Sequence, residues 1–219
     1  MMEANRAFRM LEESALMAGL RGDFPPNKAV AAAEALMSAK INVFELTMNS
    51  VQPIDAMQAI KAKYGADAVV GMGTVLTLAH AKQVIDAGAD FVVAPSFSRE
   101  VTEFVVKSGV LMIPGVITPT EIVDAWNAGA RLLKLFPIGT LGVEYFKALQ
   151  GPLGHIKYIC NGGMTDENVP GFIKAGAVAC GMANWLTGDG AMSPNMIRQR
   201  AETLRRLVNQ ARGGGGRVV

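Results

Sequence analysis

A lysine in the middle of an apolar run is the residue of this sequence most suited to covalent chemistry. Lys134 has two apolar residues on each side in Leu132-Leu133-Lys134-Leu135-Phe136. In a strand that is covered on both faces, such a side chain is poorly solvated, which favours the neutral, nucleophilic amine. A neutral amine is what a Schiff base with a keto group requires. The alternative is a structural lysine paired with a carboxylate near the rim of a sheet.

Two further charged residues, like Lys134, lie within or directly after an apolar run. Glu45 lies inside the apolar run Val43-Phe44-Glu45-Leu46-Thr47, and Arg21 follows the run Ala15–Leu20. If Glu45 shares one site with Lys134, it can transfer protons while the lysine forms the covalent bond. Taken alone, Glu45 would be the counter-ion of Lys134 or Arg21. Both interpretations are compatible, because an ion pair at rest can act as an acid–base pair during turnover. The three charges together favour catalysis.

The elements that must position these charges repeat along the chain. Six glycines recur at intervals of 20 to 25 residues, each after a helix-like segment and before a short apolar run. A glycine just past a helix end is the usual left-handed C-cap. A continuous apolar run after it is typical of a parallel strand covered on both faces. The glycines are Gly65, Gly88, Gly109, Gly129, Gly154 and Gly176.

Two more units precede these six. The runs Ala15–Leu20 and Val43–Leu46 flank a helical segment at Lys28–Ala39, and Lys40 stands where the cap glycine would be. The pattern therefore predicts eight strand–helix units, preceded by an extra helix at about Glu3–Glu13. Eight units in a chain of this length predict a (β/α)8 TIM barrel, an α/β fold. An open doubly wound sheet is less favoured, because it would usually have fewer strands and a glycine-rich turn after the first.

The domain organisation follows from the same pattern. Residues 1–212 are expected to form a single barrel domain, and residues 213–219, which include four consecutive glycines, are expected to be a flexible tail.

In a barrel of this kind the chemistry lies at the carboxyl ends of the strands. The residues where the apolar runs turn polar are therefore expected to meet at one mouth. Among them, Asn161-Gly162-Gly163 is a candidate phosphate cradle, because glycines let backbone N–H groups approach an anion. Its position after the seventh strand favours this over a simple turn. The full set is Arg21, Glu45, Thr74, Pro95, Thr118, Lys134, Asn161-Gly162-Gly163 and Gly181-Met182-Ala183.

Composition excludes several classes of protein. Half of the 219 residues are hydrophobic and 18% are charged, which excludes a disordered chain. The formal charge of +2 gives no argument for nucleic acid or membrane partners. The longest uncharged stretches have 14 residues, short of the ~18 that a membrane span needs. Two histidines are too few for a histidine metal cluster, and Cys160 and Cys180 are expected to be free buried thiols of a reducing compartment, the cytoplasm by default.

Several segments together carry a recognisable pattern. They are Phe44-Glu45-Leu46-Thr47, Gly71-Met72-Gly73-Thr74-Val75-Leu76, Ala94-Pro95, Ile113-Pro114-Gly115-Val116-Ile117-Thr118-Pro119-Thr120-Glu121, Leu133-Lys134-Leu135-Phe136-Pro137, Tyr145-Phe146-Lys147-Ala148-Leu149-Gln150-Gly151-Pro152 and Asn161-Gly162-Gly163. In this order and spacing they resemble the 2-keto-3-deoxy-6-phosphogluconate (KDPG) / 4-hydroxy-2-oxoglutarate (KHG) aldolase family. The resemblance extends from about Ala15 to Leu186.

The resemblance implies a class I aldolase that needs no metal or cofactor, forms a homotrimer and cleaves a 2-keto-4-hydroxy acid to pyruvate and an aldehyde. By this likeness, Lys134 would form the Schiff base and Glu45 would be the general acid/base. The pyruvate pocket would be lined by Thr74, Pro95 and Phe136. The distal phosphate would be held by Gly162, Gly163 and the turn at Gly181.

The chain departs from the family pattern at three places. Many relatives have an arginine after the second-strand glutamate, where this chain has Asn49, so we assign the substrate carboxylate to Arg21. Asn161 replaces a threonine, and Met182-Ala183 replaces Gly-Ser, which removes a hydroxyl from the phosphate site. The segments around Asn49 and Gly139 resemble the phosphogalactonate-cleaving branch, so the stereochemistry of the sugar stays open.

Three alternatives remain beside the phosphorylated sugar acid. The enzyme could act mainly on unphosphorylated 4-hydroxy-2-keto acids, or the chain could be a non-catalytic barrel that binds a phosphometabolite. A barrel of the thiamine-phosphate synthase type is disfavoured, because those enzymes do not need a lysine on strand six facing a glutamate on strand two.

Overall fold

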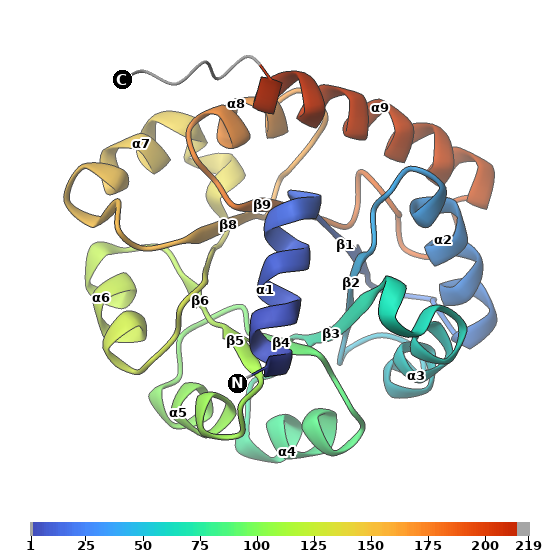
Figure 1. The fold of residues 1–219 in the computed structure, drawn as a ribbon, viewed down its shortest axis with the longest axis horizontal. Helices are drawn as coiled ribbons and strands as arrows, with labels where there is room; N and C mark the ends of the chain where they lie inside the picture. Colours follow the sequence, from blue (N-terminus) through green and yellow to red (C-terminus); the bar gives the residue numbers. More distant parts are fainter. Residues whose placement is uncertain (1, 214–219) are drawn as a thin grey trace.

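The computed structural model describes residues 2–213 of the chain, and it has the predicted barrel of alternating strands and helices (Figure 1). The strands are β1 (Leu16–Leu20), β2 (Val43–Thr47), β3 (Val69–Gly73), β4 (Phe91–Val93), β5 (Leu111–Ile113), β6 (Gly115–Val116), β7 (Leu133–Leu135), β8 (Tyr158–Asn161) and β9 (Ala179–Met182). The helices are α1 (Met2–Ser14), α2 (Pro26–Ser38), α3 (Pro53–Tyr64), α4 (Leu78–Asp86), α5 (Arg99–Lys107), α6 (Pro119–Asn127), α7 (Gly142–Leu153), α8 (Val169–Lys174) and α9 (Pro194–Gly213).

The strands form one parallel sheet in the order β5-β4-β3-β2-β1-β9-β8-β7-β6. Only Pro114 separates β5 from β6, so these two short strands are one barrel strand that the proline interrupts. The β5 half pairs with β4 and the β6 half pairs with β7, which closes the sheet into a barrel of eight strand positions. The Pro114 carbonyl still accepts a hydrogen bond from Lys134 N at 2.9 Å, although proline itself has no N–H to donate.

Positive φ, as expected for the cap glycines, occurs at Gly88, Gly109, Gly129 and Gly176. Gly65 also has positive φ, 51°, but its ψ of −117° lies outside the left-handed helical region. Lys40 has φ 59° and so adopts the left-handed conformation in place of a glycine. The prediction is wrong for Gly154, whose φ is −66°. There the chain keeps right-handed geometry, and the residue must be small because a Cβ atom would lie 2.6 Å from the Gln150 carbonyl oxygen.

The interior of the barrel is filled at the amino ends of its strands and, on β4 and β5, also at the carboxyl ends, where Val93 and Ile113 face inward. Side chains alternate along each strand, so every second residue faces inward. The inward residues form a compact layer with Ala7 and Leu11 of α1, which lies across this end of the barrel (Figure 1). The layer contains Met17, Val43, Val69, Phe91, Leu111, Leu132, Ile159 and Ala179. The free interior volume is therefore confined to the carboxyl ends of the strands.

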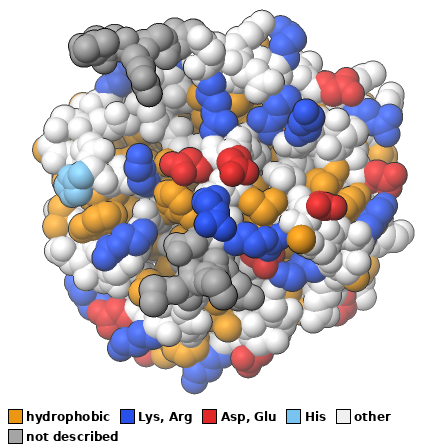
Figure 2. All heavy atoms as spheres, in the orientation of Figure 1, with side chains coloured by type: hydrophobic (Ala, Val, Ile, Leu, Met, Phe, Trp, Pro, Cys, Tyr) orange, Lys and Arg blue, Asp and Glu red, His pale blue; other side chains and the backbone are white. Residues whose placement is uncertain are grey.

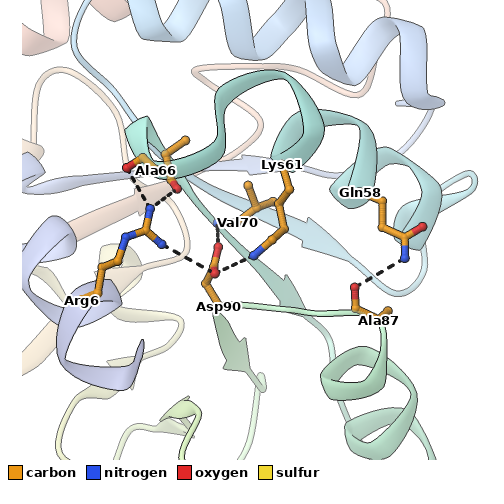
Figure 3. A network of polar contacts seen from close by, with 8 residues as sticks. Arg6, Gln58, Lys61, Ala66, Val70, Ala87 and Asp90 are labelled. Carbon is orange, nitrogen blue, oxygen red and sulfur yellow. Dashed lines mark hydrogen bonds and ion pairs between the residues drawn. The ribbon is translucent and has the colours of Figure 1, made fainter. Parts of the chain in front are cut away.

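A polar network fastens α1 to the barrel (Figure 3). Asp90 pairs with Lys61 Nζ at 2.6 Å and with Arg6 Nη1 at 3.8 Å, and it accepts a hydrogen bond from Val70 N at 2.7 Å. The Arg6 guanidinium also donates to the carbonyls of Ala66 and Ala68. Because this network joins α1 to α3, β3 and β4, it fixes the floor beneath the interior cavity.

The remaining observations concern the charge on the outer surface, the helices and the C-terminal end of the described chain. Acidic and basic side chains are interspersed on the face that Figure 2 shows, in keeping with the small formal charge. Within residues 2–213, no helix is long and apolar enough to cross a membrane. Helix α9 includes Gly213, the first residue of the expected tail; residues 214–219 lie outside the described part, so the tail stays a prediction.

The two cysteines are free and buried, as expected. They are register partners on β8 and β9 and belong to the layer between the sheet and the helices. Burial raises the pKa of both thiols, which makes them poor nucleophiles.

Candidate active site

The polar interior positions of the barrel have glycines beside them. Glu45 on β2 has Gly19 and Gly71 as register partners, Lys134 on β7 has Gly115, and Asn161 on β8 has Gly181. Because these glycines have no side chains, they leave a cavity of about 440 Å³ at the carboxyl ends of the strands.

Every residue predicted to be catalytic or to bind substrate lines this cavity. They come from seven of the eight strand positions and from the loops that follow them. The set is Arg21, Glu45, Thr74, Pro95, Lys134, Phe136, Asn161, Gly162, Gly163, Gly181, Met182 and Ala183. Thr118, which the strand-end pattern also assigned to the mouth, does not line the cavity. It is the exposed N-cap of α6 and forms a capping box with Glu121 instead.

Lys134 and Glu45 meet inside the barrel. Their strands occupy opposite positions, yet Lys134 Nζ lies 3.7 Å from Glu45 Oε1. The two residues are only 7% and 4% exposed. The Phe136 ring covers one side of the amine, with its centroid 5.1 Å from Nζ. Within residues 6–213, whose side chains are described, each of the two has the other as its one ion-pair partner. The arrangement is a buried pair of opposite charges in a chamber that glycines, uncharged polar side chains and a few apolar side chains line.

Arg21 lies at the rim of the cavity. Its side chain is exposed, and its Nη2 donates a 2.6 Å hydrogen bond to Asn184 Oδ1 in the turn after β9. The guanidinium therefore joins the loops that follow the neighbouring strands β1 and β9. It supplies a positive charge at the mouth, while Lys134 supplies one deeper in the chamber.

The glycine turn after β8 is held in a fixed shape. Gly162 and Gly163 have φ 85° and 73°, which other residues rarely adopt. The Gly162 carbonyl accepts from Gly139 N at 2.9 Å, and the Gly163 carbonyl accepts from Asn168 Nδ2 at 2.8 Å. In the described part of the chain, the Gly163 N–H has no acceptor. This donor is thus available to an anion in the cavity.

Met182 contributes its backbone rather than its side chain. In β9 the residues alternate, so that Ala179 faces the barrel interior while Cys180 and Met182 pack in the helix-facing layer. The Met182 side chain, only 2% exposed, therefore does not project into the cavity.

A family model described as "KDPG and KHG aldolase" matches residues 10–200. The chain belongs to this aldolase family. It is therefore a carbon–carbon lyase.

Individual relatives agree with this assignment. The chain is 34% identical to the 2-dehydro-3-deoxy-6-phosphogalactonate aldolase of Escherichia coli K12, over 85% of this chain and 91% of that one. A solved structure described as native KDPGal superimposes with a TM-score of 0.86 and 33% identity, covering 90% of this chain and 96% of that one. A designed cube-shaped cage, made by fusing symmetric oligomeric domains, has a TM-score of 0.85 and 32% identity, over 90% of this chain and 73% of that one.

Further residues line the cavity of this aldolase beside those predicted as its site. Thr47 follows Glu45 at the two-residue period of a strand, which is the signal that places both on the inner face. Its Oγ1 lies 2.8 Å from Ser50 Oγ, which in turn accepts from Gly22 N. Asn184 reaches the cavity from the turn after β9, and no local pattern in the sequence distinguishes it. Trp185 lines the cavity too, and its place just past Gly181-Met182-Ala183 in the sequence already predicts that it lies near the site. The other additional residues are Gly19, Asn49, Met164 and Thr165.

Proposed function

We propose that this aldolase is a class I enzyme that cleaves a 2-keto-3-deoxy-6-phospho sugar acid to pyruvate and an aldehyde. The observation that carries the proposal is the Lys134–Glu45 pair, 3.7 Å apart in a chamber that opens to the carboxyl ends of the strands. Lys134 Nζ attacks the C2 carbonyl of the substrate, and loss of water leaves a protonated imine at C2.

The proposed imine supplies the electron sink for bond cleavage, so the reaction as written needs no metal or cofactor. The C4 hydroxyl loses its proton as the C3–C4 bond breaks, and the aldehyde leaves. The electron pair of that bond forms an enamine, which then takes a proton at C3. Water hydrolyses the resulting imine to pyruvate and free Lys134. Glu45, which faces the lysine from β2, is the group that moves both protons, in keeping with its burial beside the reacting nitrogen.

The remaining cavity residues are assigned to the two ends of the substrate. Thr74, Pro95 and Phe136 enclose the pyruvate part beside Lys134. The N–H groups of the turn at Gly162 and Gly163 bind the distal phosphate, supported by the unpaired Gly163 N–H. Arg21 is assigned to the substrate carboxylate.

The carboxylate assignment predicts a selective loss of binding. Arg21→Ala is expected to weaken pyruvate binding by about 1.5 kcal/mol, or roughly tenfold, because the exposed guanidinium makes a charge-assisted hydrogen bond that water partly screens. Isothermal titration with pyruvate measures the change, and Arg131→Ala, at an exposed position away from the cavity, serves as the control. Normal pyruvate binding by the Arg21 variant would move the carboxylate to Asn49 and Thr74.

Substrate preference tests the proposed function directly. Pyruvate release should be fastest with a phosphorylated six-carbon 2-keto-3-deoxy acid and slower with 4-hydroxy-2-oxoglutarate. Ala183→Ser restores a hydroxyl donor beside the phosphate turn and should lower KM for the phosphorylated substrate about tenfold, the net value of one hydrogen bond. KM for the unphosphorylated acid should not change. Equal rates with both substrates, and no effect of the serine, would favour the unphosphorylated keto acid instead; no pyruvate release from any acid would favour a non-catalytic barrel.

A homotrimer is proposed as the assembly, as the family resemblance implies. The designed cage of fused symmetric oligomeric domains, which this chain resembles, supports an oligomeric barrel. Val51 and Leu76, which are 45% and 51% exposed in the loops after β2 and β3, are candidates for the apolar contacts between subunits.

A further inference from the structure

Glu45 lies across the neighbouring strand β3 rather than in a pocket of its own. A Cβ atom built on Gly73 would lie 2.1 Å from Glu45 Oε1, 2.7 Å from its Cδ and 2.8 Å from its Cγ. All three distances are far shorter than any van der Waals contact, so the glutamate side chain occupies the volume that a side chain at position 73 would fill. The close approach is possible only because Gly73 has no side chain.

The atom that lies over Gly73 is also the atom that faces the lysine. Glu45 Oε1 is 3.7 Å from Lys134 Nζ, which is too long for a hydrogen bond. Within residues 6–213, the carboxylate has no other ion-pair partner. Electrostatic attraction alone therefore does not fix the orientation of the carboxylate. The shape of the wall against which it lies, the bare backbone of Gly73, sets its position.

We propose that Gly73 is a positioning residue for Glu45, and that any side chain at this position displaces the carboxylate from Lys134. The inference rests on the proposed function, because it assigns to Glu45 the transfer of protons at the lysine-bound intermediate. Gly73 itself touches no reacting atom; it acts through the carboxylate.

The variant Gly73→Ala tests this inference because the backbone at Gly73 does not have positive φ, so alanine fits the strand without torsional strain. Two measurements with pyruvate distinguish imine formation at Lys134 from proton transfer by Glu45. Borohydride trapping at Lys134 needs only the imine, whereas exchange of the pyruvate methyl protons in D₂O, followed by NMR, also needs the acid/base group. Gly73→Ala should lower exchange by ~10²-fold, as loss of a general acid/base does, and keep trapping.

Combining the substitutions at Gly73 and Glu45 in one variant gives a second test. Glu45→Gln should lose exchange to the same extent, and adding Gly73→Ala to it should cause little further loss of exchange, since both act on one group. Gly151→Ala on α7 is the matched control: it is the same substitution at a glycine without positive φ, outside the cavity, where an added Cβ would have no heavy atom within 4 Å. That variant should keep the wild-type ratio of exchange to trapping.

A stability measurement covers the case in which Gly73→Ala folds poorly. The overlap with Glu45 should lower the Tm of Gly73→Ala, and Glu45→Ala should remove most of that loss in the double variant, because it empties the contested volume. Wild-type exchange by Gly73→Ala, or equal loss of trapping and exchange, would overturn the inference about Gly73. Failure of the wild type to be trapped at Lys134, or normal exchange by Glu45→Gln, would instead overturn the proposed function on which it rests.

Discussion

Incubation with pyruvate and borohydride is expected to attach a stable adduct to Lys134 and to no other lysine, with complete loss of aldolase activity. Borohydride reduces an imine to a secondary amine, whereas a simple ion pair between lysine and pyruvate leaves no covalent product. Lys134 is buried in the chamber with only Glu45 as its ion-pair partner among the described side chains, so it is the amine placed to react. Peptide mapping by mass spectrometry identifies the labelled residue.

The variant Lys134→Arg separates charge from nucleophilicity. Arginine keeps the positive charge beside Glu45 but stays protonated and cannot form the imine, so turnover and labelling should both fall below detection. Lys157→Arg, at an exposed position just before β8, is the matched control and should behave as the wild type. Labelling at a different lysine, or measurable turnover by Lys134→Arg, is incompatible with the Schiff-base assignment.

The second large effect is expected at Glu45. Glu45→Gln keeps the size of the side chain but removes the group that accepts and returns protons, so kcat should fall by ~10²-fold or more. Pyruvate should still be trapped at Lys134 by borohydride, because the lysine is intact. Steady-state kinetics and the trapping yield, measured on one preparation, distinguish loss of proton transfer from loss of imine formation.

A surface glutamate provides the control for this variant. Glu144→Gln removes a carboxylate whose side chain is 80% exposed and paired only with Lys147 in the described structure, so kcat should not change. If Glu45→Gln retained full activity, the carboxylate would be no more than the counter-ion of Lys134.

The sequence determined the architecture because the signals for it are local. The two-residue alternation within strands, the apolar runs that parallel strands need and the cap glycines are properties of short segments. They predicted the eight units and the extra helix α1. The barrel rule then placed Lys134, Glu45 and the other strand-end residues in one mouth, since parallel strands bring their carboxyl ends together. Except for Thr118, every strand-end residue placed in the mouth on this basis lines the cavity.

Only the tertiary structure decided how these residues meet. Lys134 and Glu45 are 89 positions apart on opposite strands, and their 3.7 Å approach depends on barrel closure and on glycines contributed by neighbouring strands. Gly73 has no local signal for its contact with Glu45, because that contact arises from the pairing of β2 with β3. Likewise, the hydrogen bond from Arg21 to Asn184 joins residues 163 positions apart that meet only when β1 pairs with β9. Local patterns specify elements, whereas register and closure, which are set by packing over the whole barrel, specify the distances within the site.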